Sequence, residues 1–435
     1  MNESRRRVLQ RTDHEPEKKG QLTLLVTIIG ALLAGFAQPA LAGGFYIDSL
    51  GTPSSLGTAG AGNATSSFGP DAAWANPAGL VWLGPRRVMT ASVQLLEPVA
   101  EFDPEVAEAG GSDGGDAGDT AVIPTFFYAQ PLNDDWSFGF GVSALQGGGV
   151  DFGNDFVGRY GTVDILLTGI GATWSLGYQV NDRFSVGFGG TLVYSDFEQT
   201  IAVNQGQFDD GLVKVRDADD LGVQPIVGLQ YRLSDAAMFG LTWRGEFDAE
   251  LEGNVRFSNF VLPLPTQRNI EVDWTNPQWV EAGFRFGNPG GHGYWLVSGN
   301  WQEWSEFSDN RLGIDTRLGQ IVQELDRNWD DSWRVALAYS TRSYAEQGDG
   351  WSVGLSYESS VVDDDDRTID LPLDASWSLS GAYGRFNPDS RRGWSLAATL
   401  QVFDDAKVDQ TSQGVRFAGE FDDYYVLFVG ATYRF

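Results

Sequence analysis

The stretch "YYVLFVGATYRF", residues 424–435, decides the fold because its side chains alternate with a period of two. Every second residue from Tyr425 to Phe435 is apolar, whereas Thr432 and Arg434 belong to the opposite face. This alternation predicts a β-strand with one apolar face. A soluble sandwich would also bury such a face, but a chain that ends on Phe after such a strand is typical of outer-membrane barrels.

The same alternation recurs in "RFSVGFGGTLVY" (residues 183–194), "WSVGLSYE" (351–358) and "GWSLAATLQV" (393–402). In each stretch one face is aliphatic or aromatic and the other carries mainly Ser, Thr or Gly. Apolar outer faces with small polar inner faces suit a bilayer outside and a wet or plugged lumen inside. Because lipid cannot satisfy free backbone groups, such strands must close into a barrel.

We therefore predict an all-β fold, a 14-stranded antiparallel transmembrane β-barrel with an N-terminal hatch in the lumen. An even number of strands is expected for a bacterial outer-membrane barrel. The predicted strands cover residues 86–98, 121–131, 136–147, 163–180, 184–202, 220–233, 237–257, 271–287, 293–305, 331–344, 350–361, 373–386, 393–404 and 422–435. Short connections between them predict periplasmic turns, and the longer ones, among them residues 306–330 and 405–421, predict outer loops.

The composition excludes several classes of function. The formal net charge is −30, which excludes nucleic-acid binding. There is no Cys, so neither disulfides nor thiolate chemistry can occur. Of the two His residues, His14 precedes the barrel and His292 lies in a Gly-rich turn, which makes a Ser-His-Asp hydrolase a weak alternative. We expect no catalysis, no cofactor and no dedicated metal site.

The predicted outer loops are strongly acidic. Residues 101–119 contain seven carboxylates and no basic residue, and residues 363–366 are four consecutive Asp. Such runs usually solvate exposed loops. A second interpretation is that divalent cations bridge these loops to lipopolysaccharide phosphates, although no EF-hand spacing is present.

The N-terminus predicts export. Basic residues at positions 5–19 precede the apolar run 22–37 and "ALA" at 40–42, the pattern of a cleaved signal peptide over residues 1–42. A single membrane anchor is the alternative, but the run is short for a bilayer span. We expect a multi-pass barrel in the outer membrane of a Gram-negative cell.

Residues 43–85 lie between this export signal and the barrel of residues 86–435. They are rich in Gly, Ala and Ser and show no sustained alternation. A fourteen-stranded barrel is wide enough to need filling, since about eight strands already close around side chains alone. The segment therefore predicts a hatch folded inside the lumen, in which Pro77 ends a helix or turns the chain.

This segment resembles the N-terminal hatch of the long-chain fatty acid transporter family (FadL/TodX type). The resemblance rests on Gly44 and Phe45, on the small residues 56–62, and on the hatch motif Asn76, Pro77 and Ala78. Later matches are "VGRYG" (157–161), "NPQWVEAGFRF" (276–286), "WQEWSEF" (301–307), "NWDDSWRVALAY" (328–339) and "DLPLDASWSLSGAYG" (370–384). It implies a hatch-plugged barrel that carries hydrophobic compounds inward through a loop groove, a pocket beside the hatch and a lateral opening at a kink of the third strand.

The resemblance also implies where substrate would bind. For the hatch-side pocket we expect Phe45, Tyr46, Phe68 and Trp74, with hatch core as the alternative role. For the loop groove we expect Phe260, Val261, Leu262 and Leu264, unless these pack against neighbouring loops. The candidates for the strand kink are Gly139, Gly141, Gly147, Gly148 and Gly149, although the last three could simply begin a loop.

A fatty-acid carboxylate would require a cation in the lumen. Strand alternation points four arginines inward, Arg244, Arg285, Arg334 and Arg434. Their alternative partners are the hatch or inward carboxylates such as Glu246 and Glu281. The acidic mouth would disfavour an anion, so a neutral alkane or aromatic hydrocarbon stays open as the substrate.

Two further classes of function stay open. One is a general porin, although the hatch argues against it. The other is a structural or adhesive barrel. The partners we expect are a long-chain fatty acid or another hydrophobic small molecule, outer-membrane lipid and lipopolysaccharide. We also expect the barrel-assembly machinery to bind the strand ending in Phe435, and the protein to be a monomer.

Overall fold

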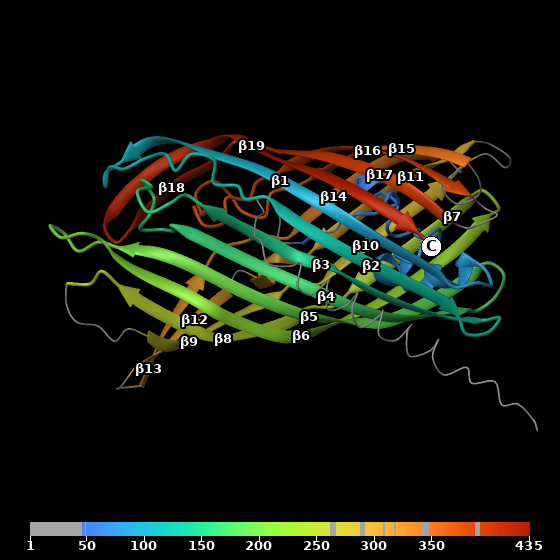
Figure 1. Cartoon of the computed structure of the whole chain (residues 1–435), viewed down its shortest axis with the longest axis horizontal. Coiled ribbons are helices and arrows are strands. Elements are labelled where there is room, and N and C mark those ends of the chain that lie inside the picture. Colours follow the sequence, from blue (N-terminus) through green and yellow to red (C-terminus); the bar gives the residue numbers. More distant parts are fainter. Residues whose placement is uncertain are drawn as a thin grey trace, which may run out of the picture. The chain divides into compact units, whose positions relative to one another are not determined.

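The structure is a computed structural model that describes residues 46–47, 49–261, 267–287, 292–307, 309–316, 319–341, 348–387 and 392–435. Its strands form one antiparallel sheet that closes on itself, because β1 (Val88–Ala107) pairs with both β2 (Ala121–Pro131) and β19 (Val415–Arg434) (Figure 1). The predicted signal peptide, residues 1–42, lies outside the described residues.

The wall contains fourteen antiparallel strands, as predicted, and five of them are interrupted. The other uninterrupted strands are β3 (Trp136–Asp151), β4 (Asp164–Gln179), β5 (Phe184–Val203), β6 (Gly211–Ser234), β15 (Gly348–Glu358) and β16 (Ser376–Asn387). The interrupted strands are β7 (Ala237–Arg244) with β8 (Phe247–Ser258), β9 (Gln267–Asn276) with β10 (Trp279–Phe286), β11 (Gly293–Gln302) with β12 (Asp309–Thr316), β13 (Gly319–Asp326) with β14 (Ser332–Thr341), and β17 (Arg392–Phe403) with β18 (Ala406–Ser412). The short helix η3 (Trp304–Phe307) separates β11 from β12.

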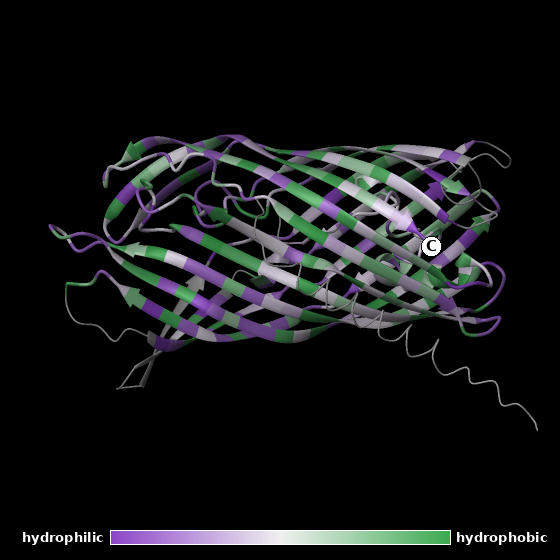
Figure 2. Cartoon of the chain, viewed as in Figure 1, coloured by the Kyte–Doolittle hydropathy of each residue, from purple (hydrophilic) through white to green (hydrophobic). Residues whose placement is uncertain are grey.

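Side chains along the wall alternate between apolar and polar, which Figure 2 shows as bands of green and purple along the strands. In β15, Trp351, Val353 and Leu355 are exposed on the outer surface, whereas Ser352 and Ser356 are buried in the lumen. This is the pattern required of strands that meet lipid outside and packed polar groups inside. The predicted fold class is confirmed.

The strands run further than the sequence predicts. The predicted outer loop 306–330 contains β12 and β13, and the predicted loop 405–421 contains β18 and the start of β19. In β18, Ala406 and Val408 are buried while Lys407 and Asp409 are exposed, so the alternation continues with charged residues on the outer face. We predicted loops there because the outward residues are no longer apolar, although the ladder continues.

The barrel has two different ends. Connections at one end, which we call the turn end, are short, such as residues 132–135 between β2 and β3. The opposite end, which we call the loop end, carries the longer connections, such as residues 359–375 between β15 and β16. The C-terminus lies near the turn end (Figure 1).

Residues 46–84, which we call the lumen segment, fold inside the barrel near the turn end (Figure 1). The segment contains η1 (Leu56–Thr58), α2 (Ala72–Ala75) and η2 (Pro77–Leu83). Hydroxyls of Ser175 on β4, Thr242 on β7 and Thr399 on β17 donate to its backbone carbonyls at 2.9–3.1 Å. None of the helices in the described residues is long and apolar enough to cross a membrane.

Glycines in the wall allow the lumen segment to approach it closely. A Cβ on Gly187 of β5 would lie 2.4 Å from the Ala78 amide nitrogen, and one on Gly240 of β7 would lie 1.9 Å from the Ala64 carbonyl oxygen. Such distances are far inside van der Waals contact. Any larger residue at either position would push the lumen segment away from the wall.

Candidate functional site

Asn76 anchors the lumen segment to the wall. Its side chain is fully buried, and Nδ2 donates to the carbonyl oxygens of Ala64, Leu229 and Leu241 at 2.7–3.2 Å. Its Oδ1 accepts from the Ala78 amide at 3.1 Å and thereby caps η2, which has Pro77 at its first position. One side chain thus joins two parts of the lumen segment to β6 and β7.

A buried guanidinium lies beside the same turn. Arg244 of β7 is fully buried, and its Cζ lies 4.3 Å from the ring centroid of Trp74 and 5.6 Å from that of Trp279. Arg244 donates to the Thr191 hydroxyl at 3.1 Å, and its Nη2 donates to the Trp74 carbonyl. This arrangement places a cation in an aromatic pocket on the side of α2 that faces the loop end.

Arg244 forms no ion pair within the described part of the chain. No described carboxylate lies within 4.0 Å of its guanidinium, and its Nε has no hydrogen-bond partner there. Tyr46 donates to the Pro277 carbonyl at 2.7 Å, and the Gln224 side chain hydrogen-bonds to both Tyr46 and Arg244. Because an isolated buried charge is costly, the site is suited to an anion.

Aromatic side chains extend from this site toward the loop end. The ring of Tyr46 lies 5.2 Å from that of Trp304, and Trp304 lies 5.8 Å from Trp329. Phe307 lies 5.0 Å from Trp329 and 6.1 Å from Trp274. We call these five residues the aromatic track. It is a continuous series of ring contacts that runs from η3 to Tyr46, which Gln224 links to Arg244.

The wall beside Tyr46 has a gap. β2 and β3 pair from Pro131↔Ser137 to Phe126↔Val142, and no further. Beyond that point β2 stays paired with β1 and β3 stays paired with β4. Residues 121–125 and 143–151 therefore face each other without ladder bonds, and we call this gap the window.

The window closes again toward the loop end. The Ala117 amide donates to the Ala100 carbonyl of β1 at 2.9 Å, and the Asp151 amide of β3 donates to the Ala117 carbonyl at 3.0 Å. Residues 116–118 thus connect β1 to β3 on the loop-end side of the window. The window is thus a break in the β2–β3 ladder that is bounded at both ends.

β3 bends into the lumen along the window. Its residues 142–150 are all buried, and its pairing with β4 is irregular between Ala144 and Gln146. The bent part forms a backbone bridge from Gln146 to Tyr46, and the Ile47 amide donates to the Leu145 carbonyl at 2.9 Å. The start of the lumen segment, which carries Tyr46, therefore lies against the bend.

The five glycine candidates fall into two groups. Gly147, Gly148 and Gly149 lie in the bent part of β3 beside the window. Gly139 and Gly141 lie in the regular part of the ladder, where the absence of a side chain leaves space for neighbouring residues. A Cβ on Gly139 would lie 2.6 Å from that of Ala73 in the lumen segment.

Arginine side chains link the loop-end connections to one another. Arg367 is 3% exposed and donates to the carbonyl oxygens of Leu373 and Lys407 at 2.8 and 3.0 Å. Arg159 pairs with Asp210 at 2.8 Å and donates to the Gly110 carbonyl at 2.9 Å. These contacts link connections that are far apart in the sequence. We call the linked connections at the loop end the cap.

A third pair in the cap is Arg327 with Asp370, whose Nη2 and Oδ2 atoms lie 2.9 Å apart. Burial by itself would raise the pKa of Asp370. The charge of Arg327 and the hydrogen bonds from Arg327 and Thr368 outweigh it, so the pKa lies below its usual value. Asp370 is therefore ionised at neutral pH and holds the connection 359–375 against Arg327.

The structure separates the other residues that the sequence singled out. Phe68 lies on the turn-end side of the lumen segment, where the Arg285 guanidinium stacks on it at 4.3 Å. Phe260 and the exposed Val261 lie at a loop-end tip, and Phe260 lies 6.0 Å from Phe257. Phe45, Leu262 and Leu264 lie outside the described residues.

All four inward arginines contact the lumen segment, Arg244 through the Trp74 carbonyl. Arg285 donates to the Thr65 carbonyl and the Ser67 hydroxyl at 3.2 and 2.9 Å. Arg334 donates to the Ala59 carbonyl at 3.3 Å, and Arg434 to the Phe68 carbonyl at 2.9 Å.

The suggestion that Glu246 points inward is wrong. Residues 245–246 separate β7 from β8, and this break changes the alternation, so Glu246 is exposed while Glu281 is fully buried. No group of three or more His, Asp or Glu in the described ranges is arranged to hold a metal ion.

Sequence reasoning missed most of the aromatic track. Trp274, Trp304, Phe307 and Trp329 come from β9, η3 and the segment before β14. Two of them lie in a stretch that we predicted as an outer loop. A high density of Trp within residues 274–333 was the available signal, but the sequence could not show that the rings meet.

A closed barrel with an apolar outer face, a filled lumen and a window beside an internal aromatic site defines an outer-membrane transport barrel. The chain belongs to the family of outer membrane protein transport proteins (OMPP1/FadL/TodX), whose sequence profile matches residues 33–435. Family and fold together place the protein in the outer membrane.

Individual relatives are distant in sequence and close in fold. The long-chain fatty acid transport protein of Salmonella typhi is 23% identical over 406 residues, which cover 86% of this chain and 89% of that protein. The crystal structure of a Pseudomonas aeruginosa FadL homologue matches with a TM-score of 0.80 at 18% identity, over 90% of this chain and 99% of that one. The Pseudomonas putida toluene transporter TodX matches with a TM-score of 0.67 at 16% identity, over 91% of this chain and 98% of that one.

Proposed function

We propose that this protein takes up hydrophobic compounds, foremost long-chain fatty acids, by passive diffusion across the outer membrane. Family membership supports transport, and the names of the relatives include both fatty-acid and toluene transporters. The chemistry of this chain's own lumen favours an amphipathic anion. No catalytic step is part of the proposal.

In this proposal the ligand enters at the loop end, where Phe260 and Val261 offer apolar contact. It then moves along the aromatic track to Tyr46 and Trp74. Each methylene taken out of water contributes about 0.8 kcal/mol, so several modest sites suffice to draw a chain inward without trapping it. It leaves through the window between β2 and β3, where the inward bend of β3 opens the wall.

The observation that carries the fatty-acid assignment is the buried guanidinium of Arg244, which has no ion pair in the described residues and lies at the inner end of the aromatic track. A fatty acid has an acyl chain for the rings and a carboxylate for the guanidinium, which can bind it through two parallel hydrogen bonds. A neutral hydrocarbon would fill the track and leave Arg244 without an anion. The arrangement therefore fits a fatty acid better.

The test is uptake of labelled oleate and labelled hexadecane by cells whose own transporter has been deleted. Arg244→Met keeps the apolar volume and removes the charge. We expect oleate uptake to fall by about tenfold, because hydrogen bonds to a charged group contribute about 1.5–3 kcal/mol. Hexadecane uptake should stay at the parent level.

Arg183→Met is the matched control, because Arg183 is exposed at the turn end and remote from the site. Both variants must insert into the outer membrane at the parent level. An equal loss of both compounds in Arg244→Met would refute the carboxylate role. Uptake of neither compound by the inserted parent protein would point to a structural or adhesive barrel instead.

Neutral hydrocarbon uptake is the second candidate. The outer connections are strongly acidic, with four consecutive Asp at 363–366, and would repel an anion approaching the loop end. The oleate and hexadecane comparison decides between the two substrates. Raising the ionic strength should speed oleate uptake more than hexadecane uptake, because salt screens this repulsion.

We further propose that residues 1–42 are cleaved on export, that residues 43–85 act as the hatch and that residues 86–435 are the barrel domain. The lumen segment supports the second point, because its hydrogen bonds fix it across the lumen. The strand ending at Phe435 would be bound by the barrel-assembly machinery, and the acidic loops would contact lipopolysaccharide through divalent cations. We propose a monomer as the transporting unit.

A further inference from the structure

The apolar belt on the outside of the barrel is long along β5 and β6, which we call the long side. The outward residues of β5 over 184–194 and of β6 over 221–231 include no charged side chain, and the ends of these two stretches lie opposite each other in the ladder. The next outward pair toward the loop end is Asp196 with Asp219, which face each other directly. These carboxylates end the belt, which therefore extends over ten residues of each strand.

The belt is shorter on β11, β14, β15 and β16, which we call the short side. On each of these strands two outward aromatic residues lie six positions apart and enclose the aliphatic part of the belt. The pairs are Trp295 and Trp301 on β11, Trp333 and Tyr339 on β14, Trp351 and Tyr357 on β15, and Trp377 and Tyr383 on β16. Aromatic girdles of this kind mark the two membrane–water interfaces of a barrel.

Ring contacts join the aromatic residues nearer the turn end into one row. The ring of Tyr339 lies 5.2 Å from that of Trp295 and 5.5 Å from that of Trp351. Just beyond this row, Asp349 and Arg385 form an exposed ion pair at 3.3 Å on the outer surface. An exposed ion pair belongs in water or among lipid headgroups, so the row lies at the boundary of the hydrocarbon.

A second row lies toward the loop end. The ring of Tyr357 lies 5.3 Å from that of Trp333 and 4.9 Å from that of Trp377. Trp301, opposite Trp333 in the ladder, donates its indole N–H to the exposed Asp331 at 3.2 Å. Because an indole at the membrane interface directs its N–H toward polar groups, this contact places the second row at the other boundary.

Strand geometry converts these spacings into thickness. Ten residues extend about 33 Å along a strand, or about 25 Å along the membrane normal at a tilt of about 40°. This is the usual height of the apolar band of an outer-membrane barrel, so the long side matches an ordinary bilayer. Six residues cover only about 15 Å along the normal. The short side is therefore about 10 Å too short for the same bilayer.

The short side lies across the barrel from the window. β3 is the third strand of the fourteen-stranded wall and β14 belongs to the tenth, so seven positions, half the circumference, separate them. The long side lies much nearer the window, because β5 is the fifth strand.

We propose that the short side thins the bilayer locally, so that lipid headgroups on both surfaces settle at the two rows of rings. A short apolar stretch can also be accommodated by snorkelling side chains or by association of two copies. Asp331 and Asp349 are too short to snorkel, and ring rows flanked by exposed charges suit lipid headgroups better than a protein partner. The partner that fits this face is lipid with short or disordered acyl chains.

The consequence is a bilayer of unequal thickness around one barrel, thin across from the window and of ordinary thickness beside β5 and β6. The proposal concerns the lipid that surrounds the protein. It does not depend on which compound the barrel transports.

Nitroxide labels on single cysteines measure the depth of the belt ends, since the chain has no Cys of its own. The variants are Trp377→Cys and Tyr383→Cys on the short side, and Phe184→Cys and Tyr194→Cys on the long side. Each full-length variant is reconstituted in dipalmitoleoyl-phosphatidylcholine bilayers, and collisions with oxygen and with a nickel chelate give the depth of its label below the lipid phosphates. Phe188→Cys, within the long side, is the reference for a label among acyl chains.

We expect all four end labels to lie at the same depth. In a bilayer of uniform thickness, the depths at 377 and 383 would together exceed those at 184 and 194 by about 10 Å, which would overturn the proposal. Labels at 377 and 383 that neither oxygen nor the nickel chelate reaches would show that a second copy covers this face, and would overturn it as well.

Lengthening the belt tests whether the bilayer follows it. Asp349 and Arg385 lie opposite each other in the β15–β16 ladder, so Asp349→Leu with Arg385→Leu extends the apolar face by two residues at the turn end. We expect the label at 383 to move about 5 Å deeper. Asp349→Asn with Arg385→Gln removes the same charges without adding apolar length and should leave the label in place. Both variants should fold, because an exposed ion pair contributes little to stability. A label that keeps its depth in the leucine variant would contradict the proposal.

Discussion

Asn76 combines a local role with a long-range one at the scale of a single residue. An Asn before a Pro predicts a capped turn, and Asn76 does accept from the Ala78 amide at 3.1 Å. Its contacts with the carbonyls of Leu229 and Leu241 link positions more than 150 residues apart. The sequence predicted a helix end or turn at Pro77, but only the closed barrel brings these carbonyls together.

Asn76→Ala should loosen the lumen segment, because buried carbonyls of β6 and β7 would lose their donor. We expect the free energy of local opening to fall by about 2–5 kcal/mol, since each buried unsatisfied group costs about 1–3 kcal/mol. Hydrogen exchange of the amides in residues 62–80 measures this opening. Asn181→Ala, in an exposed turn where water can replace the side chain, should leave their exchange unchanged.

Equal protection of these amides in Asn76→Ala and the parent would show that wall packing alone holds the lumen segment. The glycine contacts at 187 and 240 would then be the main determinant of its position.

Asp71 makes the lumen segment sensitive to pH. Burial raises the pKa of Asp71, although hydrogen bonds from Ser54 and Thr52 oppose the shift. A carboxyl whose pKa is raised in the folded protein binds a proton more tightly than in the unfolded chain. Stability should therefore increase as the pH falls through the folded pKa and level off below about pH 4, the ordinary value for Asp.

Asp71→Asn should remove this dependence, because the amide does not titrate. The measurement is the thermal midpoint of the detergent-solubilised protein between pH 4 and pH 8, taken as the difference between parent and variant. Other groups titrate equally in both proteins and cancel. If the difference in thermal midpoint does not change between pH 4 and pH 8, Asp71 keeps the same charge over this range, and the predicted pH dependence is wrong.

At the scale of strands, period-two alternation predicted most of the wall and missed its extension toward the loop end. β2 begins and ends where the sequence predicts, whereas β6 starts at Gly211 and not at residue 220. The prediction relied on apolar outer residues, and this signal disappears where the strand leaves the bilayer. Alternation alone could not predict the gap between β2 and β3, because each strand looks regular and only their pairing stops at Phe126↔Val142.

The connection 359–375 should depend on the Arg327–Asp370 pair. Both side chains are largely buried, at 13% and 11% exposure, so Asp370→Asn leaves a guanidinium without its counter-charge. We expect a loss of about 2–4 kcal/mol in the local stability of the cap. Limited proteolysis of the connection in intact cells measures it.

The same pair gives the cap a dependence on pH. The pKa of Asp370 lies below its usual value, so its contribution is complete above about pH 4 and is lost as the pH falls through the folded pKa. Acid should therefore increase cleavage in the parent and change it little in Asp370→Asn. Asp363→Asn, at an exposed neighbour in the same connection, is the control and should match the parent at every pH.

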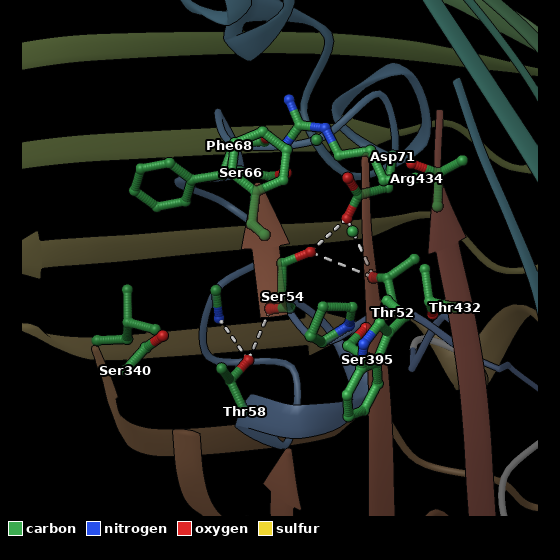
Figure 3. Close-up of a pocket in the computed structure, with 18 of the residues that line it drawn as sticks. Thr52, Ser54, Thr58, Ser66, Phe68, Asp71, Ser340, Ser395, Thr432 and Arg434 are labelled. Atoms are coloured by element: carbon green, nitrogen blue, oxygen red, sulfur yellow. Dashed lines mark hydrogen bonds between the residues drawn. The ribbon is translucent and has the colours of Figure 1, made fainter. Parts of the chain in front are cut away.

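At the scale of the whole molecule, the lumen segment divides the interior into two regions with different chemistry. The region toward the loop end contains the aromatic track, Arg244 and the window. The region toward the turn end contains a cavity lined by Phe68, Asp71 and Arg434 (Figure 3). A ligand that moves from the aromatic track to the window should therefore stay on the loop-end side of the lumen segment.

A reversible cross-link across the window tests this division. Continuing the register beyond Phe126↔Val142 places Thr125 opposite Ser143, so Cys at both positions would join β2 to β3 where their ladder ends. The chain has no Cys of its own, which makes this disulfide unique. A cross-link at Gln130 and Phe138, already paired in the ladder, is the control.

Oxidation of the Thr125→Cys, Ser143→Cys variant should reduce oleate uptake to the level of cells without the protein, and a reductant should restore it. The control cross-link should leave oleate uptake at the parent level under both conditions. Full oleate uptake through the oxidised variant would show that long chains bypass the window and pass the lumen segment itself.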